Sequence, residues 1–232
     1  MKRILLKLSG EALSNNSGDI YDVNFVDKVA EALVVAKNRG FEIAVVIGAG
    51  NIWRGRQGGD MDRISADRMG MLATVINSIC VKEAIERAGA EAAVMTAIAM
   101  PPLAEVYSSD TAKQYLSEGK IVVFGAGLGI PFLSTDTAGA VRAAEIGADA
   151  MFMAKNIDYV YTADPRIDPN AKKIERIKAS EVLAMNLKAI DATATAFCLS
   201  SNMPIHVFGL KDPLDIVKAL EGKTVGTVIT AE

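Results

Sequence analysis

The stretch VVFGAGLGIPFLSTDTA, residues 122–138, decides the fold of this chain. It opens with an apolar run typical of a buried strand, breaks at three glycines spaced two apart, and continues into a hydroxyl-rich helix start. Glycines let the backbone approach a ligand closely, and the first amides of a helix attract an anion. The stretch therefore predicts an anion site, with a tight turn and N-capping residues as the plainer alternative.

Two other apolar strands, expected at residues 3–8 and 41–47, also run into glycine-containing loops. Helices are expected at residues 25–39, 65–87, 110–118, 137–146, 180–185, 189–200 and 214–221, the first two capped by Asn24 and Ser65. Further strands are expected at residues 91–97, 150–154, 204–208 and 227–230, with turns at 158–165. This alternation predicts a largely parallel sheet covered on both faces, with the glycine loops in one crevice at its carboxyl edge.

Composition fits one large α/β domain or two tightly joined lobes, since the chain has 232 residues of which 50% are hydrophobic. A net charge of −3 gives no electrostatic case for binding nucleic acid or an anionic membrane. No apolar run suits a signal peptide or a membrane span. Cys80 and Cys198 lie in apolar helical contexts and are expected to be buried, inert thiols. These observations predict a soluble cytoplasmic protein.

Positive charge near the glycine loops points to a multiply phosphorylated ligand. Lys7 ends the first strand and Arg54 follows the second loop. Phosphoryl transfer requires positioning and positive charge on the transferring group. Asp136 would hold such a lysine in place or lie near Mg²⁺. The plainer alternatives are a strand-end surface lysine and a solvated loop arginine.

Motifs of other nucleotide-binding classes are absent. The sequence contains no Gly-x-x-x-x-Gly-Lys-Ser/Thr phosphate loop. The dinucleotide-binding pattern Gly-x-Gly-x-x-Gly is incomplete in residues 125–130 and 48–53, where Ile130 and Trp53 occupy the position of the last glycine. This argues against a nicotinamide dehydrogenase. The single histidine, His206, lies in an apolar strand and is expected to be a packed residue. This argues against triad hydrolysis and histidine-based metal sites.

Five segments in order resemble the bacterial uridylate kinases of the amino acid kinase family, and the resemblance covers essentially the whole chain. They are KLSGEAL at 7–13, VVIGAGNIWRG at 45–55, DRMGMLAT at 67–74, PFLSTDTA at 131–138 and YTADP at 161–165. The resemblance implies an α/β fold, a three-layer αβα sandwich around a central, mostly parallel sheet of eight strands. It also implies a single domain, residues 1–232, with a UMP lobe at 1–153 and an ATP lobe at 154–232.

The activity that the resemblance implies is transfer of the γ-phosphoryl of ATP to UMP, giving UDP and ADP, in pyrimidine nucleotide biosynthesis. Mg²⁺ is expected to enter with ATP, and no protein residues are assigned as metal ligands. The resemblance further implies a cytoplasmic homohexamer that binds neither nucleic acid nor membrane.

Site residues follow from the same resemblance. Catalysis is assigned to Lys7, Arg54 and Asp136, with Asp136 orienting Lys7. The ATP-binding residues implied are Lys7, Leu8, Ser9, Gly10, Gly50, Arg54, Asn156, Tyr161 and Asp164. The UMP-binding residues implied are Ala49, Asp67, Leu128, Gly129, Ile130, Pro131, Phe132, Leu133, Ser134 and Thr135, with Asp67 binding the ribose hydroxyls.

Three positions depart from the family pattern. Ala49 and Tyr159 stand where many members have glycine, Tyr159 in the loop on the adenine side. The loop at residues 14–20 lacks the glycine-rich pattern of members activated by GTP, which predicts weak or absent GTP activation.

Two other functions stay open on the sequence. One is a kinase of the same family acting on carbamate, acetylglutamate or aspartate, against which Asp67 and the following Met-Gly-Met favour a nucleotide acceptor. The other is a nucleotide- or oxyanion-binding storage or regulatory protein, which would not need Lys7, Arg54 and Asp136 together.

Overall fold

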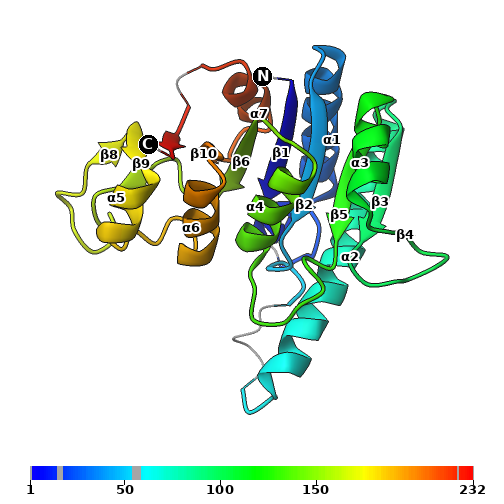
Figure 1. Cartoon of the computed structure of the whole chain (residues 1–232), viewed down its shortest axis with the longest axis horizontal. Helices are drawn as coiled ribbons and strands as arrows, with labels where there is room; N and C mark the ends of the chain where they lie inside the picture. The colour runs from blue at the N-terminus through cyan, green and yellow to red at the C-terminus, as the bar shows by residue number, and fades with distance from the viewer. Residues whose placement is uncertain (1, 15–17, 54–58, 224, 232) are drawn as a thin grey trace.

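Nine strands of the described residues form one sheet in a computed structural model that describes residues 2–14, 18–53, 59–223 and 225–231 (Figure 1). The strand order is β4-β3-β5-β2-β1-β6-β10-β11-β9, and every neighbouring pair is parallel except β10 and β11. The strands are β1 Arg3–Leu8, β2 Glu42–Ile47, β3 Ala92–Thr96, β4 Glu105–Val106, β5 Ile121–Gly125, β6 Ala150–Lys155, β9 Arg176–Lys178, β10 Ile205–Gly209 and β11 Thr227–Thr230. A separate hairpin pairs β7 Val160–Tyr161 with β8 Lys173–Ile174.

Helices cover both faces of the sheet, which confirms the predicted three-layer α/β architecture (Figure 1). One face packs on α1 Val23–Asn38, α2 Arg63–Arg87 and α7 Leu214–Leu220. The other packs on α3 Ser109–Ser117, α4 Thr135–Glu145, α5 Ala179–Ala184 and α6 Ala192–Ser200. Successive strand residues alternate between the two cores: Leu6 contributes to the α1 side and Leu5 to the α4 side.

Strand register places the glycine loops side by side, as predicted. Leu8 at the end of β1 is level with Ile47 of β2 and with Ala154 of β6, and Phe124 of β5 is level with Val46. The carboxyl ends of β5, β2, β1 and β6 therefore lie at one edge of the sheet. The loop after β1 continues as a short 3-10 helix, η1 Gly10–Leu13.

Several expectations are corrected. The sheet has nine strands instead of eight, and one edge is formed by β4, only two residues long. The segment expected only to turn contains β7, and β8 and β9 follow it. Helix α1 is capped by Asp22 instead of Asn24, and α2 by Asp62 instead of Ser65. In both helices an aspartate that precedes the expected residue is the N-cap, and its carboxylate accepts a hydrogen bond from a backbone amide of the first turn.

The apolar setting of His206 and Cys198 is confirmed. The His206 ring lies between those of Phe152 and Phe208 and bonds the Val225 carbonyl. Cys198 is buried, and burial raises its thiol pKa to about 12. Cys80 is half-buried instead of buried, and burial likewise raises its pKa. Among the described residues, no helix combines the length and apolar character needed to cross a membrane.

Two expectations fall on residues outside the described part of the chain. Arg54, assigned to catalysis and to ATP, lies in the segment 54–58. Residues 15–17 belong to the loop on which the expectation about GTP rests. Both expectations stay predictions.

Candidate active site

A buried ion pair joins Lys7 to Asp136 at the carboxyl edge of the sheet. Lys7 continues the alternation of β1 on the side of Leu5, which packs against α4. Asp136 is the second residue of α4, and its Oδ1 lies 2.9 Å from the Lys7 Nζ. Burial alone would raise the pKa of Asp136, but its attraction to Lys7 and Lys155 outweighs burial and holds the pKa below its ordinary 3.8. The contact expected between Asp136 and Lys7 is thus present.

A second lysine shares the same carboxylate. Lys155, the last residue of β6, lies with its Nζ 2.7 Å from Oδ2 of Asp136 and also donates to the Ala189 carbonyl. Burial lowers the pKa of Lys155, and the attraction of Asp136 partly opposes that shift. Sequence reasoning missed Lys155. A signal was available, because Lys155 ends an apolar parallel strand just as Lys7 does.

Most of the residues expected to bind UMP line one cavity of about 210 Å³. Its walls come from the second glycine loop, from α2 and from the loop before α4. The expected residues among the lining are Ala49, Asp67, Leu128, Ile130, Leu133, Ser134 and Thr135. Gly129, Pro131 and Phe132 belong to the same loop but do not line the cavity.

The first turns of α2 hold this loop in place. Phe132 has a positive φ of 70°, and its amide donates to Asp67 Oδ2 at 2.8 Å. The guanidinium of Arg63 lies 5.7 Å from the centre of the Phe132 ring, and its Nε is 2.9 Å from Asp67 Oδ1. A non-glycine residue at positive φ persists only where its surroundings fix it, and Asp67 and Arg63 provide those contacts.

The start of α4 is tied to the start of α6 by a second aspartate. Ser134 caps α4 by accepting the amides of Asp136 and Thr137, each at 3.1 Å. Asp191 caps α6 through the Ala194 amide at 2.7 Å, and it also accepts the hydroxyls of Ser134 and Thr137. Sequence reasoning missed Asp191, because this contact joins segments 54 residues apart or more.

Close backbone packing explains the glycine at position 10. A Cβ on Gly10 would lie 2.3 Å from the Gly48 carbonyl oxygen, so only glycine fits between the first two loops. Asn77, a buried residue of α2, donates to that same carbonyl at 2.7 Å. Asn77 therefore braces the second loop from α2, a role for which its sequence position gave no signal.

The residues expected to bind ATP do not all contact one another. Ser9 donates its amide to the Ala154 carbonyl at 3.2 Å, and Asn156 donates to Glu11 at 3.1 Å, so Asn156 lies beside the first loop. Tyr161 instead bonds Asp158 at 2.9 Å, and Asp164 pairs with Arg166 at 2.7 Å. Among the described residues, no hydrogen bond or ion pair joins Tyr161 or Asp164 to Lys7 or Asn156.

Leu8, Gly50 and Tyr159 are the remaining positions singled out in the sequence, and each packs against its neighbours. Leu8 is fully buried in the sheet. A Cβ on Gly50 would lie 2.8 Å from Cγ of Glu11. Tyr159 packs its ring under Lys173, whose Nζ is 4.5 Å from the ring centre.

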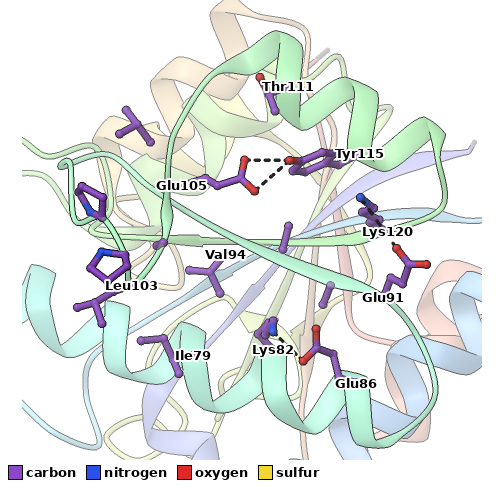
Figure 2. Close-up of a pocket in the computed structure, with 16 residues that line it drawn as sticks. Ile79, Lys82, Glu86, Glu91, Val94, Leu103, Glu105, Thr111, Tyr115 and Lys120 are labelled. Carbon is purple, nitrogen blue, oxygen red and sulfur yellow. Dashed lines mark hydrogen bonds and ion pairs between the residues drawn. The ribbon is translucent and has the colours of Figure 1, made fainter.

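Of two further cavities, one is lined by the predicted residue Asp136 and the other by none of the predicted site residues. One of about 340 Å³ adjoins Asp136 and Lys155 and is walled by the connection from α5 to α6, including Asn186 and Lys188. The other, of about 820 Å³, lies between α2, β3 and α3 (Figure 2). There Tyr115 bonds Glu105 and Lys82 pairs with Glu86, and no predicted site residue lines it.

The model of the amino acid kinase family matches residues 2–209. The chain belongs to the amino acid kinase family. Among solved structures, the UMP kinase from Bacillus anthracis is 34% identical with a TM-score of 0.96, covering 100% of this chain and 96% of that one. The UMP kinase from Ureaplasma parvum is 36% identical with a TM-score of 0.93, covering 99% and 98%. The uridylate kinase from Archaeoglobus fulgidus is 26% identical with a TM-score of 0.74, covering 99% and 100%. These likenesses confirm the family and the fold expected from the sequence.

Proposed function

We propose that this member of the amino acid kinase family transfers the γ-phosphoryl of ATP to UMP, giving UDP and ADP for pyrimidine nucleotide biosynthesis. One observation supports the proposal most directly: the first residues of α4 both line the cavity and supply the partner of Lys7. Ser134 and Thr135 line the 210 Å³ cavity, and the next residue, Asp136, pairs with Lys7. A cavity for an acceptor thus adjoins a fixed positive charge. Full-length likeness to proteins named UMP kinases supports the same activity.

The charge on Lys7 is the main chemical contribution of the described residues. In phosphoryl transfer, the reacting group carries its negative charge on three equatorial oxygens, and a preorganised cation stabilises it. Asp136 fixes the ammonium of Lys7, so little reorganisation is needed when the substrates arrive. Arg54, in the segment outside the described residues, is proposed as a second charge on the same group.

UMP is proposed to occupy the 210 Å³ cavity. The amino end of α4 with Ser134 and Thr135 faces the 5′-phosphate, where helix amides favour an anion. Apolar side chains of Leu128, Ile130 and Leu133 offer surface for the uracil, together with the backbone of residues 129–132. Ala49 contacts UMP through its backbone, and Asp67 receives the ribose hydroxyls.

ATP is proposed to lie across the ends of β1, β2 and β6. The loop from Leu8 to Gly10, with Gly50, surrounds the phosphates. Asn156 lies beside that loop and, with Tyr161 and Asp164 of the β7–β8 segment, binds the adenosine. On this assignment residues 1–153 form the UMP lobe and residues 154–232 the ATP lobe.

Magnesium is proposed to arrive with ATP. In the described part of the chain, no group of three or more histidine, cysteine, aspartate or glutamate side chains is arranged to hold a metal ion. Both oxygens of Asp136 already contact lysines. These residues fit an ion held chiefly by the nucleotide phosphates, as is common for Mg²⁺, which when bound would offset the phosphate charge.

We further propose, on family resemblance, that the protein is a cytoplasmic homohexamer without nucleic-acid or membrane partners. Size-exclusion chromatography with light scattering tests the assembly, and a monomer at assay concentration contradicts it.

Turnover on a panel of acceptors tests the proposed function. The purified chain is incubated with ATP and Mg²⁺ plus UMP, CMP, carbamate, acetylglutamate or aspartate, and ADP is measured by a coupled assay. Rapid, UMP-dependent ADP release is expected, with Lys7→Ala as the negative control. Faster turnover with a carboxylate or carbamate supports the kinase alternative. Tight ATP binding without turnover on any acceptor supports the storage or regulatory alternative.

A further inference from the structure

The loop between β5 and α4 has a non-glycine residue at positive φ near each end. Ala126, directly after β5, has a φ of 61°, and Phe132 has a φ of 70°. Elsewhere among the described residues, the non-glycine residues at positive φ are Asn186 and Asn202, and asparagine tolerates this conformation. An alanine or a phenylalanine keeps it only where the surroundings fix the backbone. Residues 126–132 also supply much of the wall of the proposed UMP cavity.

Helix α2 provides a hydrogen-bond acceptor for each of these two residues. The Phe132 amide donates to Oδ2 of Asp67 at 2.8 Å, and the Ala126 amide donates to Oγ1 of Thr74 at 2.8 Å. Asp67 and Thr74 stand about two helical turns apart, so their side chains lie on the same face of α2. The two bonds therefore fasten both ends of the loop to one helix.

The hydroxyl of Thr74 has its proton already engaged. It donates to the Met71 carbonyl at 2.6 Å, so towards Ala126 the oxygen acts as an acceptor. Thr74 and Ala126 are both buried, and Thr74 itself lines the 210 Å³ cavity. If the Thr74 oxygen were removed, the buried Ala126 amide would lose its partner, and a buried unpaired amide is costly. The loop would then leave the conformation that forms the cavity wall.

We propose that Thr74 is a positioning residue for the acceptor nucleotide. Its buried oxygen holds Ala126 in the left-handed conformation and so shapes the loop before UMP arrives. This inference rests on the proposed function for the identity of the ligand. The competing role is purely structural, a link between α2 and the end of β5 that adds stability without shaping the cavity.

Kinetics of Thr74→Val give the first test, because valine keeps the branched shape and lacks the oxygen. The KM for UMP is expected to rise about tenfold. The KM for ATP and kcat are expected to stay nearly unchanged, since Lys7 and Arg54 are untouched. Thr74→Ser keeps the acceptor and loses only a methyl group, so its KM for UMP is expected to stay close to the wild-type value. If Thr74→Val fails to fold, Thr74→Ala, which also removes the acceptor, is measured in its place.

Thr227→Val is the matched control. Thr227 of β11 is also buried, accepts the Val160 amide at 2.8 Å and donates to the Ile174 carbonyl, so the change removes the same kind of bond pair. Its urea midpoint is expected to fall much as in Thr74→Val, with the KM for UMP at the wild-type value. Only the KM for UMP is compared, since Val160 adjoins Tyr161 on the proposed ATP side. Equal KM values for UMP in the two variants overturn the proposal.

Hydrogen exchange of the Ala126 amide gives a readout that needs no turnover. Exchange is expected to be at least about tenfold faster in Thr74→Val than in the wild type or Thr74→Ser. An unchanged exchange rate overturns the proposed hold on the loop.

Binding of UMP separates failure of this inference from failure of the proposed function. Trp53, the single tryptophan, lines the same cavity, so its fluorescence reports UMP binding. Wild-type turnover of UMP with an unchanged KM in Thr74→Val overturns the inference and leaves the kinase function standing. If the wild type does not turn over UMP, the function fails, and the fluorescence titration decides the inference. A Kd for UMP about tenfold higher in Thr74→Val then supports it, and an unchanged Kd or no wild-type binding overturns it.

Discussion

The carboxylate of Asp67 accepts a hydrogen bond from the backbone amide of Phe132, with 2.8 Å between Oδ2 and the nitrogen. This bond joins α2 to the loop before α4 across 65 residues of sequence. An aspartate in a first helical turn can complement the helix dipole, worth about 0.3–1 kcal/mol, but α2 begins at Arg63 and has no acidic residue in its first turn. Asp67, the fifth residue of α2, instead fixes the wall of the proposed UMP cavity.

Replacing Asp67 with asparagine tests its proposed bond to the ribose. Asp67→Asn keeps an oxygen for the Phe132 amide but removes the charge, and charge-assisted bonds are worth roughly 1.5–3 kcal/mol each. The KM for UMP is expected to rise at least about tenfold, a loss of about 1.4 kcal/mol, with the KM for ATP little changed. The preference for UMP over 2′-deoxy-UMP should also decline.

Asp110→Asn is the matched control for Asp67→Asn. It makes the same change at an exposed carboxylate of α3, which lies 3.9 Å from the Lys113 ammonium. Its KM for UMP is expected to stay close to the wild-type value. An unchanged KM for UMP in Asp67→Asn would leave no kinetic support for the ribose assignment.

Lys7→Ala should remove turnover without unfolding the protein. Lys155 still pairs with Asp136 when Lys7 is absent, so the buried carboxylate keeps one partner. Loss of one preorganised charge on the transferring group is expected to lower kcat by about 10²–10³. Circular dichroism checks the fold, and the coupled ADP assay checks turnover. A near-normal kcat in a folded Lys7→Ala protein rules out the role.

Gly10→Ala should disrupt the packing of the first two loops. The new Cβ would lie 2.3 Å from the Gly48 carbonyl oxygen and 2.8 Å from Oδ1 of Asn51, and backbone atoms are the hardest to displace. Both the urea midpoint and turnover are expected to fall. Gly70→Ala in α2 is the comparison, since among the described residues its Cβ would meet only Trp53, at 3.7 Å. Its stability is expected to rise by roughly 0.5–1 kcal/mol. Equal urea midpoints for the two variants contradict the steric argument.

The sheet and its glycine loops could be predicted from sequence for a physical reason. Continuously apolar strands separated by helical segments can be buried only in a parallel sheet covered on both faces. Loops at the ends of such strands then share one edge, which put Lys7 and the segment before Asp136 together. Family resemblance supplied the pairing of Lys7 with Asp136, and the 2.9 Å contact agrees with it.

Other parts of the site could not be predicted because they depend on side-chain contacts between distant segments. Asn77 looks like an ordinary polar helix residue until packing buries it against the Gly48 carbonyl. Asp191 looks only like a helix cap, yet it also accepts two hydroxyls from α4. Strands β7 and β8, of two residues each, are too short to show periodicity. Lys155 is the exception, because the sequence already placed it at the end of an apolar strand, as it did Lys7.

The single histidine should make stability depend on pH. Burial lowers the pKa of His206 below its ordinary 6.5, and the bond to the Val225 carbonyl opposes this only in part. A folded-state pKa below the unfolded one means that the unfolded chain binds more protons between the two values. Stability is therefore highest above pH 6.5 and is lost as the pH falls from there towards the folded-state pKa.

Urea unfolding of the wild type and of His206→Phe between about pH 5 and pH 7.5 measures this effect, in the range where an ordinary histidine titrates. The wild-type free energy of unfolding is expected to fall with decreasing pH, with a slope of at most about 1.4 kcal/mol per pH unit from this one group. His206→Phe loses the bond to Val225, so its stability at neutral pH is expected to be lower, but its curve should be flatter. Both proteins share the same titrating carboxylates, so the contribution of the carboxylates cancels when one curve of unfolding free energy against pH is subtracted from the other. Parallel curves across this range would show that His206 does not titrate on unfolding and that its pKa is the same in both states.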